Sequence, residues 1–196
     1  GASVMAVKQG VSVDTSMGSS PNSGLIMSTR SGDIDPMVIV HMVQDKDMAP
    51  AEVEVMLNNQ SGLRGISGFS SDLTDIVDHL EDPELKQRAE LAFNMYIHRL
   101  KGYIGSYVMA LEGRVHALVF TDDIGVNHPL VREKVCASLG WAGIEIDADR
   151  NNNAPKNEAA FIQSGSSKVK VVSIPTEEEL MICLEGGRIL GEFYGQ

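Results

Sequence analysis

A long apolar stripe between residues 85 and 108 limits what this chain can fold into more than any other feature of its sequence. Apolar side chains recur there at three- and four-residue steps over about seven helical turns. They are Leu85, Ala89, Ala92, Phe93, Tyr96, Ile97, Leu100, Tyr103, Ile104, Tyr107 and Val108. Because this spacing places them on one face of a single helix, that face has to be covered. We expect the stripe to form core, and part of it could equally bury against a second subunit.

Strands and shorter helices are expected on both sides of the stripe. Residues 3–8 and 11–16 alternate between apolar and polar side chains around Gln9-Gly10, which predicts a hairpin. Residues 115–120 and 169–174 are compact apolar runs, typical of buried strands. Further helices are predicted from Pro36, from Pro50, after the N-cap candidates Ser71 and Asp72, at 130–139 and at 177–190. Strands that alternate with helices favour an α/β fold.

Two polar or glycine-rich segments are expected to be loops. Gly62, Gly65 and Gly68 punctuate the first, and residues 149–157 form the second, which we place at the surface. A third connection, within residues 119–130, is expected to run from a strand through a loop into a helix.

The composition is that of a globular protein with a net negative charge. With 196 residues, of which 43% are hydrophobic, the chain can build its own core. A formal net charge of −11 argues against nucleic acid or an anionic membrane surface as a partner, because both reward clustered lysine and arginine. No apolar run approaches the roughly 18 residues of a membrane span. Cys136 and Cys183 lack metal-ligand spacing, so we expect two buried free thiols, as in a reducing cytoplasm.

Arg30 is the first candidate for chemistry. It lies in Ser28-Thr-Arg30-Ser-Gly-Asp-Ile-Asp-Pro36, shortly after Asp14-Thr-Ser-Met-Gly18. An arginine in a turn between small residues can present a rigid set of donors to a phosphoryl group without crowding it. The alternative is a structural arginine that is tied to Asp33 or Asp35.

The same stretch resembles the acetate kinase family, whose signature runs DTSMG and then TRSGDIDP. Further segments match the family in the same order along the chain. They are Ser61–Gly68, Ser70–Leu73, Val119–Thr121, Ile124-Gly125, Asn127, Leu130–Cys136, Pro175-Thr176 and Glu178–Met181. The resemblance therefore covers nearly the whole chain.

The resemblance implies a fold and a place within a larger protein. Family members are about twice this length, so residues 1–196 are expected to be the C-terminal, nucleotide-binding domain without the N-terminal domain. The implied fold is α/β, one lobe of the sugar kinase, Hsp70 and actin-like (ribonuclease H-like) architecture, with a mixed sheet flanked by helices. Gly1-Ala2-Ser3 is similar to the end of the family's phosphate loop, although these three residues could also be left over from cloning.

The resemblance also assigns roles to residues of this sequence. Arg30 matches the family's catalytic arginine, and Glu178 matches a glutamate associated with Mg²⁺, although an acidic residue also suits any helix start. The positions that match nucleotide-binding residues are Gly1, Ala2, Ser3, Asp72, Asp123, Ile124, Gly125 and Asn127. Asp72 could equally be only a helix cap.

This chain departs from the family pattern on the nucleotide side. Asp122-Asp123 stands where the family has Ala-Gly, and Val126 replaces a glutamate. Two carboxylates would repel nucleotide phosphates unless they bind ribose hydroxyls or a metal. Other departures are Ser19-Ser20, Asn22-Ser23, Ser28, Thr74 and Glu177.

The implied activity is that of an acetate kinase, the reversible Mg²⁺-dependent transfer of the ATP γ-phosphate to acetate. Because the rest of the active site comes from the other half of family members, we expect this chain alone to be inactive. Partners would be a nucleotide, a small carboxylate and a second subunit of a cytoplasmic homodimer. The alternatives are a catalytically weakened dimerisation or regulatory module, a kinase with another donor such as pyrophosphate, and one with another acceptor such as propionate.

The five histidines are expected to be structural or surface residues, since no pair has zinc-ligand spacing.

Overall fold

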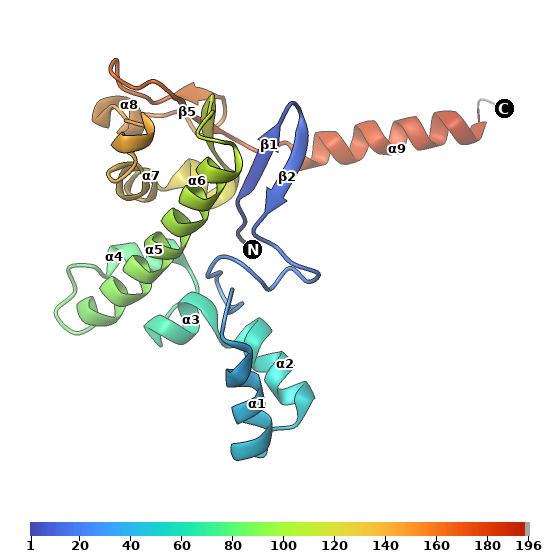
Figure 1. The fold of residues 1–196 in the computed structure, drawn as a ribbon, viewed down its shortest axis with the longest axis vertical. Helices are drawn as coiled ribbons and strands as arrows, with labels where there is room; N and C mark the ends of the chain where they lie inside the picture. Colours follow the sequence, from blue (N-terminus) through green and yellow to red (C-terminus); the bar gives the residue numbers. More distant parts are fainter. Residues whose placement is uncertain (195–196) are drawn as a thin grey trace. The chain divides into compact units, whose positions relative to one another are not determined.

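The structure is a computed structural model that describes residues 1–194 (Figure 1). The chain divides into two compact units, the first formed by Gly1–His116 and the second beginning at Ala117. Among the described residues, no helix combines the length and the apolar character needed to cross a membrane.

The first unit opens with the expected hairpin. Strands β1 (Met5–Lys8) and β2 (Val11–Thr15) pair antiparallel, with an irregular register between Ala6 and Val7. Gln9 and Gly10 connect them at φ values of 55° and 79°. Positive φ at both central positions is the requirement of a turn that matches the strand twist, and the sequence-based hairpin is confirmed.

Five helices follow the hairpin in the first unit (Figure 1). They are α1 (Pro36–Asp45), α2 (Pro50–Asn59), α3 (Gly62–Ser67), α4 (Leu73–Asp78) and α5 (Lys86–Ala110). The Asp35 carboxylate caps α1 by accepting from the Met37 amide at 2.9 Å, and Glu52 accepts from the Ala49 amide at the start of α2 at 2.8 Å. The prolines that predicted these starts lie in the first turn of each helix, as expected, whereas the two acidic caps were not predicted.

Helix α5 carries the predicted stripe and forms the centre of the first unit. Nine stripe residues are buried: Ala89, Ala92, Phe93, Tyr96, Ile97, Leu100, Ile104, Tyr107 and Val108. They pack against α3, α4 and the hairpin. Leu85 and Tyr103 are only partly buried. The prediction of a core helix is confirmed, and most of the stripe is used within the chain rather than left for a second subunit.

The second unit is a small mixed sheet with helices. Its strand order is β3-β5-β4, in which β3 (Ala117–Thr121) and β5 (Lys170–Ile174) are parallel and β4 (Ala160–Phe161) is antiparallel to β5. The helices are α6 (Asp122–Asn127), α7 (Pro129–Cys136), the 3₁₀ turn η1 (Gly140–Ala142), α8 (Ala148–Asn152) and α9 (Glu178–Tyr194). The expected α/β fold with a mixed sheet is confirmed.

Three expected loops contain helices. Residues 62–67 form α3 rather than a loop, because the amides of Leu63 and Arg64 donate to loop carbonyls of Met27 and Ser28, and Gly68 ends the helix at a φ of 75°. The polar run from 149 lies partly in α8, which Asp147 caps by accepting from the Arg150 amide. The connection after β3 is the short helix α6.

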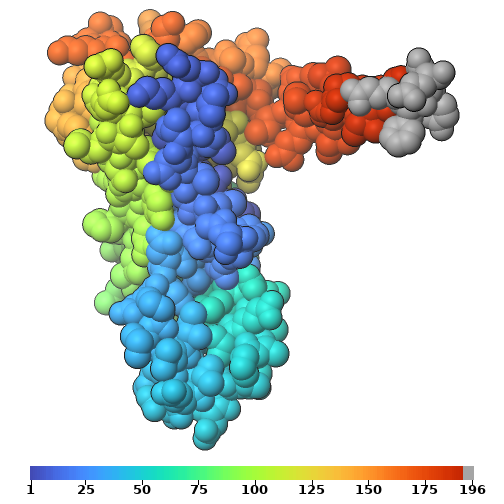
Figure 2. Space-filling model, turned by 45° about the vertical axis from the view of Figure 1, so that its right-hand side comes forward, coloured from blue at the N-terminus to red at the C-terminus, as the bar shows by residue number. Residues whose placement is uncertain are grey.

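The two cysteines differ. Cys136 is buried on α7, and burial raises the pKa of its thiol to about 12. Cys183 is exposed on α9, so the expectation of a second buried thiol was wrong. Its apolar neighbours on α9 are exposed as well: Leu180, Met181, Ile182, Leu184, Ile189 and Leu190. Figure 2 shows the part of α9 drawn in red uncovered on the face in view.

Candidate functional site

Arg30 lies in a tightly closed loop that spans residues 24–33, here called the arginine loop. The Asp33 amide donates to the Gly24 carbonyl at 3.1 Å, and the Met27 amide donates to the Arg30 carbonyl at 3.2 Å. A side chain at Gly24 (φ 95°) would place its Cβ 2.2 Å from the Ser16 carbonyl oxygen. The start of the arginine loop, at Gly24, therefore leaves no room for a larger residue.

Helices α2 and α3 hold the arginine loop through main-chain hydrogen bonds. The Ser31 amide donates to the Leu57 carbonyl at 3.0 Å, and the Ser61 amide donates to the Thr29 carbonyl at 2.9 Å. The Leu63 amide donates to the Met27 carbonyl at 2.8 Å. Since such bonds run on both sides of Arg30, the loop presents its side chain from a rigid support.

A cluster on α5 fixes the far end of the arginine loop. The Asp33 carboxylate accepts from the Gly24 amide at 2.7 Å and from the Tyr103 hydroxyl at 2.5 Å. It also pairs with Arg99 at 3.3 Å, while Arg99 donates to the Asp33 carbonyl at 3.2 Å. Burial, and then the hydrogen bond to Asp33, raise the pKa of Tyr103 to about 12. Asp33 is thus engaged in holding the loop.

The guanidinium of Arg30 keeps most of its donors unused within the described residues. Its Nη1 donates to the Pro21 carbonyl at 3.0 Å and lies 3.6 Å from Met27 Sδ. A Cβ at Gly1 would lie 3.3 Å from the same nitrogen, so the predicted phosphate-loop residue and Arg30 are neighbours. Asp33 binds Arg99 and Asp35 caps α1, so the alternative of an arginine tied to either carboxylate was wrong.

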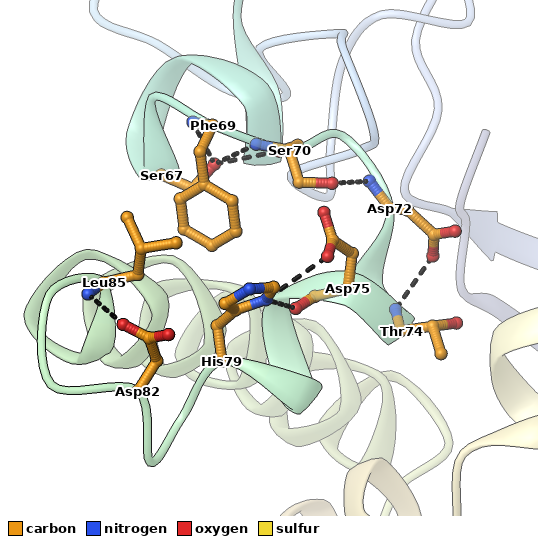
Figure 3. A network of polar contacts seen from close by, with 9 residues as sticks. All are labelled: Ser67, Phe69, Ser70, Asp72, Thr74, Asp75, His79, Asp82 and Leu85. Carbon is orange, nitrogen blue, oxygen red and sulfur yellow. Dashed lines mark hydrogen bonds and ion pairs between the residues drawn. The ribbon is translucent and has the colours of Figure 1, made fainter.

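Asp72 is the N-cap of α4, as expected (Figure 3). Its carboxylate accepts from the Thr74 amide at 2.8 Å, and its own amide donates to Ser70 Oγ at 3.1 Å. Ser70 is held in turn by the fully buried Ser67 hydroxyl, which accepts from the Ser70 amide at 3.1 Å. The Asp72 carboxylate is exposed, so capping leaves it accessible to a ligand, and its nucleotide role stays a prediction.

His79 closes the other end of α4 (Figure 3). Its Nδ1 donates to the Asp75 carbonyl at 2.7 Å, and its ring meets Phe69 edge-on with centroids 5.4 Å apart. The hydrogen bond to the Asp75 carbonyl, supported by nearby carboxylates, raises the pKa of His79 above 6.5. This is a structural position, and within residues 1–194 no group of three or more His, Cys, Asp or Glu side chains is arranged to hold a metal ion.

In the second unit, residues 122–127 bring two of the predicted nucleotide-binding residues together. The Asp123 carboxylate accepts from the Asn127 side-chain amide at 2.6 Å. Asp122 adopts a φ of 60° and accepts from the Asp123 amide at 2.7 Å. A Cβ at Gly125 would approach the Phe120 carbonyl carbon to 3.0 Å, so glycine lets this turn lie against β3. Asp122 and Asp123 are both exposed.

Arg132 is an important residue that the sequence analysis did not single out. It is 1% exposed and donates to the carbonyls of Gly125 and Val126 at 2.8 and 2.7 Å. Its Nε and Nη2 donate to the side-chain and main-chain oxygens of Asn151, both at 2.7 Å. Burial lowers the pKa of Arg132. The available signal was its position on the apolar face of α7, one turn before Cys136.

Glu178 begins α9 and is exposed. No hydrogen bond or ion pair engages its carboxylate among the described residues, so its oxygens are available. Mg²⁺ keeps several waters and needs only one or two protein carboxylates when substrate phosphates complete its shell. A single exposed carboxylate fits that requirement, although it could not hold the ion alone.

Comparison with known proteins places these features in one family. The family profile described as "Acetokinase family" matches residues 1–184. The chain is 46% identical to the acetate kinase of Caldicellulosiruptor saccharolyticus over 190 residues, which is 97% of this chain and 47% of that protein. It superimposes on the crystal structure of Porphyromonas gingivalis acetate kinase with a TM-score of 0.88 and 39% identity, covering 96% of this chain and 46% of that one. A propionate kinase from Francisella tularensis gives a TM-score of 0.83 and 37% identity over 92% of this chain and 44% of that one.

The chain belongs to the acetokinase family. It spans about half the length of the curated relatives it matches, as expected of a C-terminal half.

Proposed function

We propose that this chain is the nucleotide-binding half of an acetate kinase. The reaction is the reversible transfer of the ATP γ-phosphoryl group to acetate, which forms a bond between an acetate oxygen and phosphorus, breaks the bond to the β-phosphate oxygen and releases ADP. The supporting observation is the Arg30 guanidinium, which the arginine loop holds beside Gly1 and which no carboxylate engages within the described residues.

Arg30 stabilises the charge that spreads over the phosphoryl oxygens during transfer. Phosphoryl transfer depends mainly on positioning and on cations placed where that charge develops. A guanidinium with unused donors and no competing carboxylate suits this role, because it needs no internal ion pair to be broken first.

We assign nucleotide binding to the eight residues at positions that match the family's nucleotide-binding residues. They are Gly1, Ala2, Ser3, Asp72, Asp123, Ile124, Gly125 and Asn127. Gly1 is favoured by its closeness to Arg30, and Asp72 by a carboxylate that remains exposed while it caps α4. Asp123 and Asn127 act as a bonded pair.

Mg²⁺ supplies charge neutralisation on the nucleotide phosphates when it is bound, and we assign Glu178 to hold it through water. The exposed carboxylate at the start of α9 supports this assignment. The chain supplies no further carboxylate cluster for the ion within its described residues.

We also propose that the protein is a cytoplasmic homodimer and that this chain alone does not turn over. The relatives are about twice as long, which supports a missing half of the active site. A free thiol exposed on α9 suits a reducing compartment. For the dimer, α1 is a better candidate than the buried stripe, because four consecutive apolar residues of α1, Met37 to Val40, are exposed.

Calorimetric titration of the chain with Mg-ATP, Mg-ADP and Mg-pyrophosphate tests the proposal. Millimolar or tighter nucleotide binding supports it. The Asp72→Ser variant keeps a helix cap but loses the carboxylate, so it should weaken nucleotide binding, whereas Asp35→Ser at the equivalent cap of α1 should not. Absence of binding of any donor, together with a stable dimer, would instead favour a dimerisation or regulatory module.

Asp122 and Asp123 favour a second candidate, a kinase with a donor other than ATP. Two exposed carboxylates on the nucleotide side oppose phosphate binding near them. Pyrophosphate does not need an adenosine pocket, so binding of Mg-pyrophosphate without Mg-ATP would select this candidate. The similarity to a propionate kinase keeps propionate as a candidate acceptor.

A further inference from the structure

The contacts of Arg132 and Asn151 form a buried cluster in the second unit for which the proposed reaction gives no account. Arg132 and Asn151 are each 1% exposed. A buried cation without a carboxylate partner is costly unless its donors are satisfied. Four hydrogen bonds from Arg132 to oxygen atoms fulfil that condition.

Two of the four acceptors belong to the short helix α6. Arg132 Nη1 bridges the carbonyls of Gly125 and Val126, near the end of a helix of only six residues. The last carbonyls of any helix lack partners within it, so Arg132 supplies the bonds that α6 cannot supply itself. On its other side, the turn packs on β3 through Gly125, where a Cβ would lie 3.0 Å from the Phe120 carbonyl carbon.

Asn151 fixes Arg132 in turn. Its side-chain oxygen accepts from Arg132 Nε and its main-chain oxygen accepts from Nη2, while its side-chain amide donates to the Pro129 carbonyl at 3.0 Å. The residue sits on α8, which Asp147 caps. Helices α6, α7 and α8 are therefore joined through one guanidinium and one amide.

We propose that Arg132, held by Asn151, is a positioning residue for the turn 122–127 and sets the geometry in which this turn meets the nucleoside part of the substrate. The second half of this statement rests on the proposed function. Arg132 is buried behind the turn and does not itself touch the nucleotide.

Amide hydrogen exchange of the unliganded chain tests the positioning role without any ligand. Arg132→Lys keeps the charge but cannot make the planar set of four bonds. We expect the amides of residues 124–128 to exchange about tenfold faster or more, as loss of one or two such bonds implies, while β3 and β5 exchange as before. Arg150→Lys, on the exposed face of α8, is the matched control and should change neither region.

Nucleotide affinity provides the second readout. In Arg132→Lys the Kd for Mg-ADP should rise about tenfold, whereas the Kd for Mg-pyrophosphate, which has no nucleoside, should change less than about twofold. If Arg132→Lys does not fold, Asn151→Ala gives the same test in milder form, because three of the four Arg132 bonds remain. Asn151→Asp, which keeps the acceptor for Nε, should retain most of the affinity.

The outcomes separate the two claims. Faster exchange confined to 124–128 together with weaker ADP binding supports the proposal. Exchange that rises equally throughout the second unit, or not at all, overturns the positioning role. Faster local exchange with unchanged ADP affinity overturns its link to the nucleotide. An unaltered chain that binds neither ADP nor pyrophosphate would contradict the proposed function, and the positioning role would then be judged by exchange alone.

Discussion

Arg30 and Arg132 carry the same side chain, but their surroundings give the two residues different roles. Arg30 is half-buried, bonds one carbonyl and one sulfur, and meets no carboxylate within the described residues. Arg132 is 1% exposed and directs four hydrogen bonds to main-chain and amide oxygens. The first is supported by the backbone around it, and the second is itself the support.

Arg30 is therefore available to a ligand, whereas the hydrogen-bond donors of Arg132 are occupied within the fold. The arginine loop is held by main-chain bonds to α2 and α3 and by the Asp33 cluster, so it does not depend on the Arg30 side chain. The turn 122–127 depends directly on Arg132. Removing the two side chains should therefore have opposite consequences for activity and stability.

The largest effect is expected from Arg30→Ala on catalysis. We suggest joining this chain to the N-terminal half of the Caldicellulosiruptor saccharolyticus acetate kinase, to which it is 46% identical, and trapping acyl phosphate with hydroxylamine. Loss of a cation that stabilises the transferring phosphoryl group should lower kcat by about 10³ to 10⁵. The KM for ATP should change little. A kcat within tenfold of the unaltered chimera would show that Arg30 is not used in the transfer.

For stability we expect the reverse, with Arg132→Ala more destabilising than Arg30→Ala. Arg132→Ala leaves several buried oxygens without a donor and should lower the free energy of unfolding by about 3 kcal/mol or more. Arg30→Ala loses an exposed hydrogen bond to the Pro21 carbonyl and a weak one to Met27 Sδ, and should cost about 1 kcal/mol or less. Urea denaturation of both variants measures this, and equal losses would remove the distinction.

The hydrogen bonds of the Asp33 cluster should contribute less to the free energy of unfolding than those of Arg132. Tyr103→Phe removes the hydroxyl that donates to Asp33 and should cost about 1 kcal/mol in the free energy of unfolding. Tyr107→Phe is the matched control, because no hydrogen bond of standard geometry engages the buried Tyr107 hydroxyl within the described residues. Burial, and then the charge of Asp14, raise the pKa of Tyr107 to about 12. A Tyr107→Phe variant less stable than Tyr103→Phe would contradict this account of the cluster.

Neutralising the acidic pair of the turn should strengthen nucleotide binding modestly. Asp122→Asn with Asp123→Asn removes two charges while keeping side-chain shape, and asparagine tolerates the φ of 60° at position 122 better than alanine. Screened repulsion of this kind is worth about 1 kcal/mol, or roughly a fivefold lower Kd for Mg-ATP. Titration calorimetry decides the matter, and an unchanged Kd would show that the two carboxylates do not oppose the phosphates.

The smallest effect concerns pH. Because the folded state raises the pKa of His79 above 6.5, its contribution to stability is fully present below that pH and is lost as pH rises through the folded pKa. Urea denaturation at pH 5.5 and pH 8 should therefore show a pH-dependent difference that His79→Gln reduces. His98→Gln, at an exposed position of α5, is the control. A difference that survives in His79→Gln would have another source.

The sequence predicted what depends on local patterns. The stripe on α5, the hairpin and the starts of α1 and α2 follow from periodicity, turn residues and helix-start prolines, and all were found. Helix α3 was missed because its glycines indicate a loop, while the bonds that stabilise it come from residues 27 and 28, far away in sequence. Tertiary contacts of this kind leave no local signal.

For the candidate site, too, the sequence indicated residues that lie in motifs and missed residues whose role depends on tertiary contacts. Motifs singled out Arg30, Asp72 and the turn 122–127, whose roles stay predictions, but motifs could not show that Asp33 binds Arg99 and Tyr103 instead of Arg30. Arg132 was missed because a charged residue in an amphipathic helix is usually solvated. Its partner Asn151 was expected in a surface loop and is instead buried on α8.

A crystal structure of the chimera with Mg-ADP, acetate and an aluminium fluoride that mimics the transferring phosphoryl group tests the central claim most directly. We predict that Arg30 donates at least one hydrogen bond of about 3 Å to the fluoride atoms, with the arginine loop unchanged. An Arg30 side chain that stays on Pro21 and Met27, with the bound mimic out of its reach, would contradict the account.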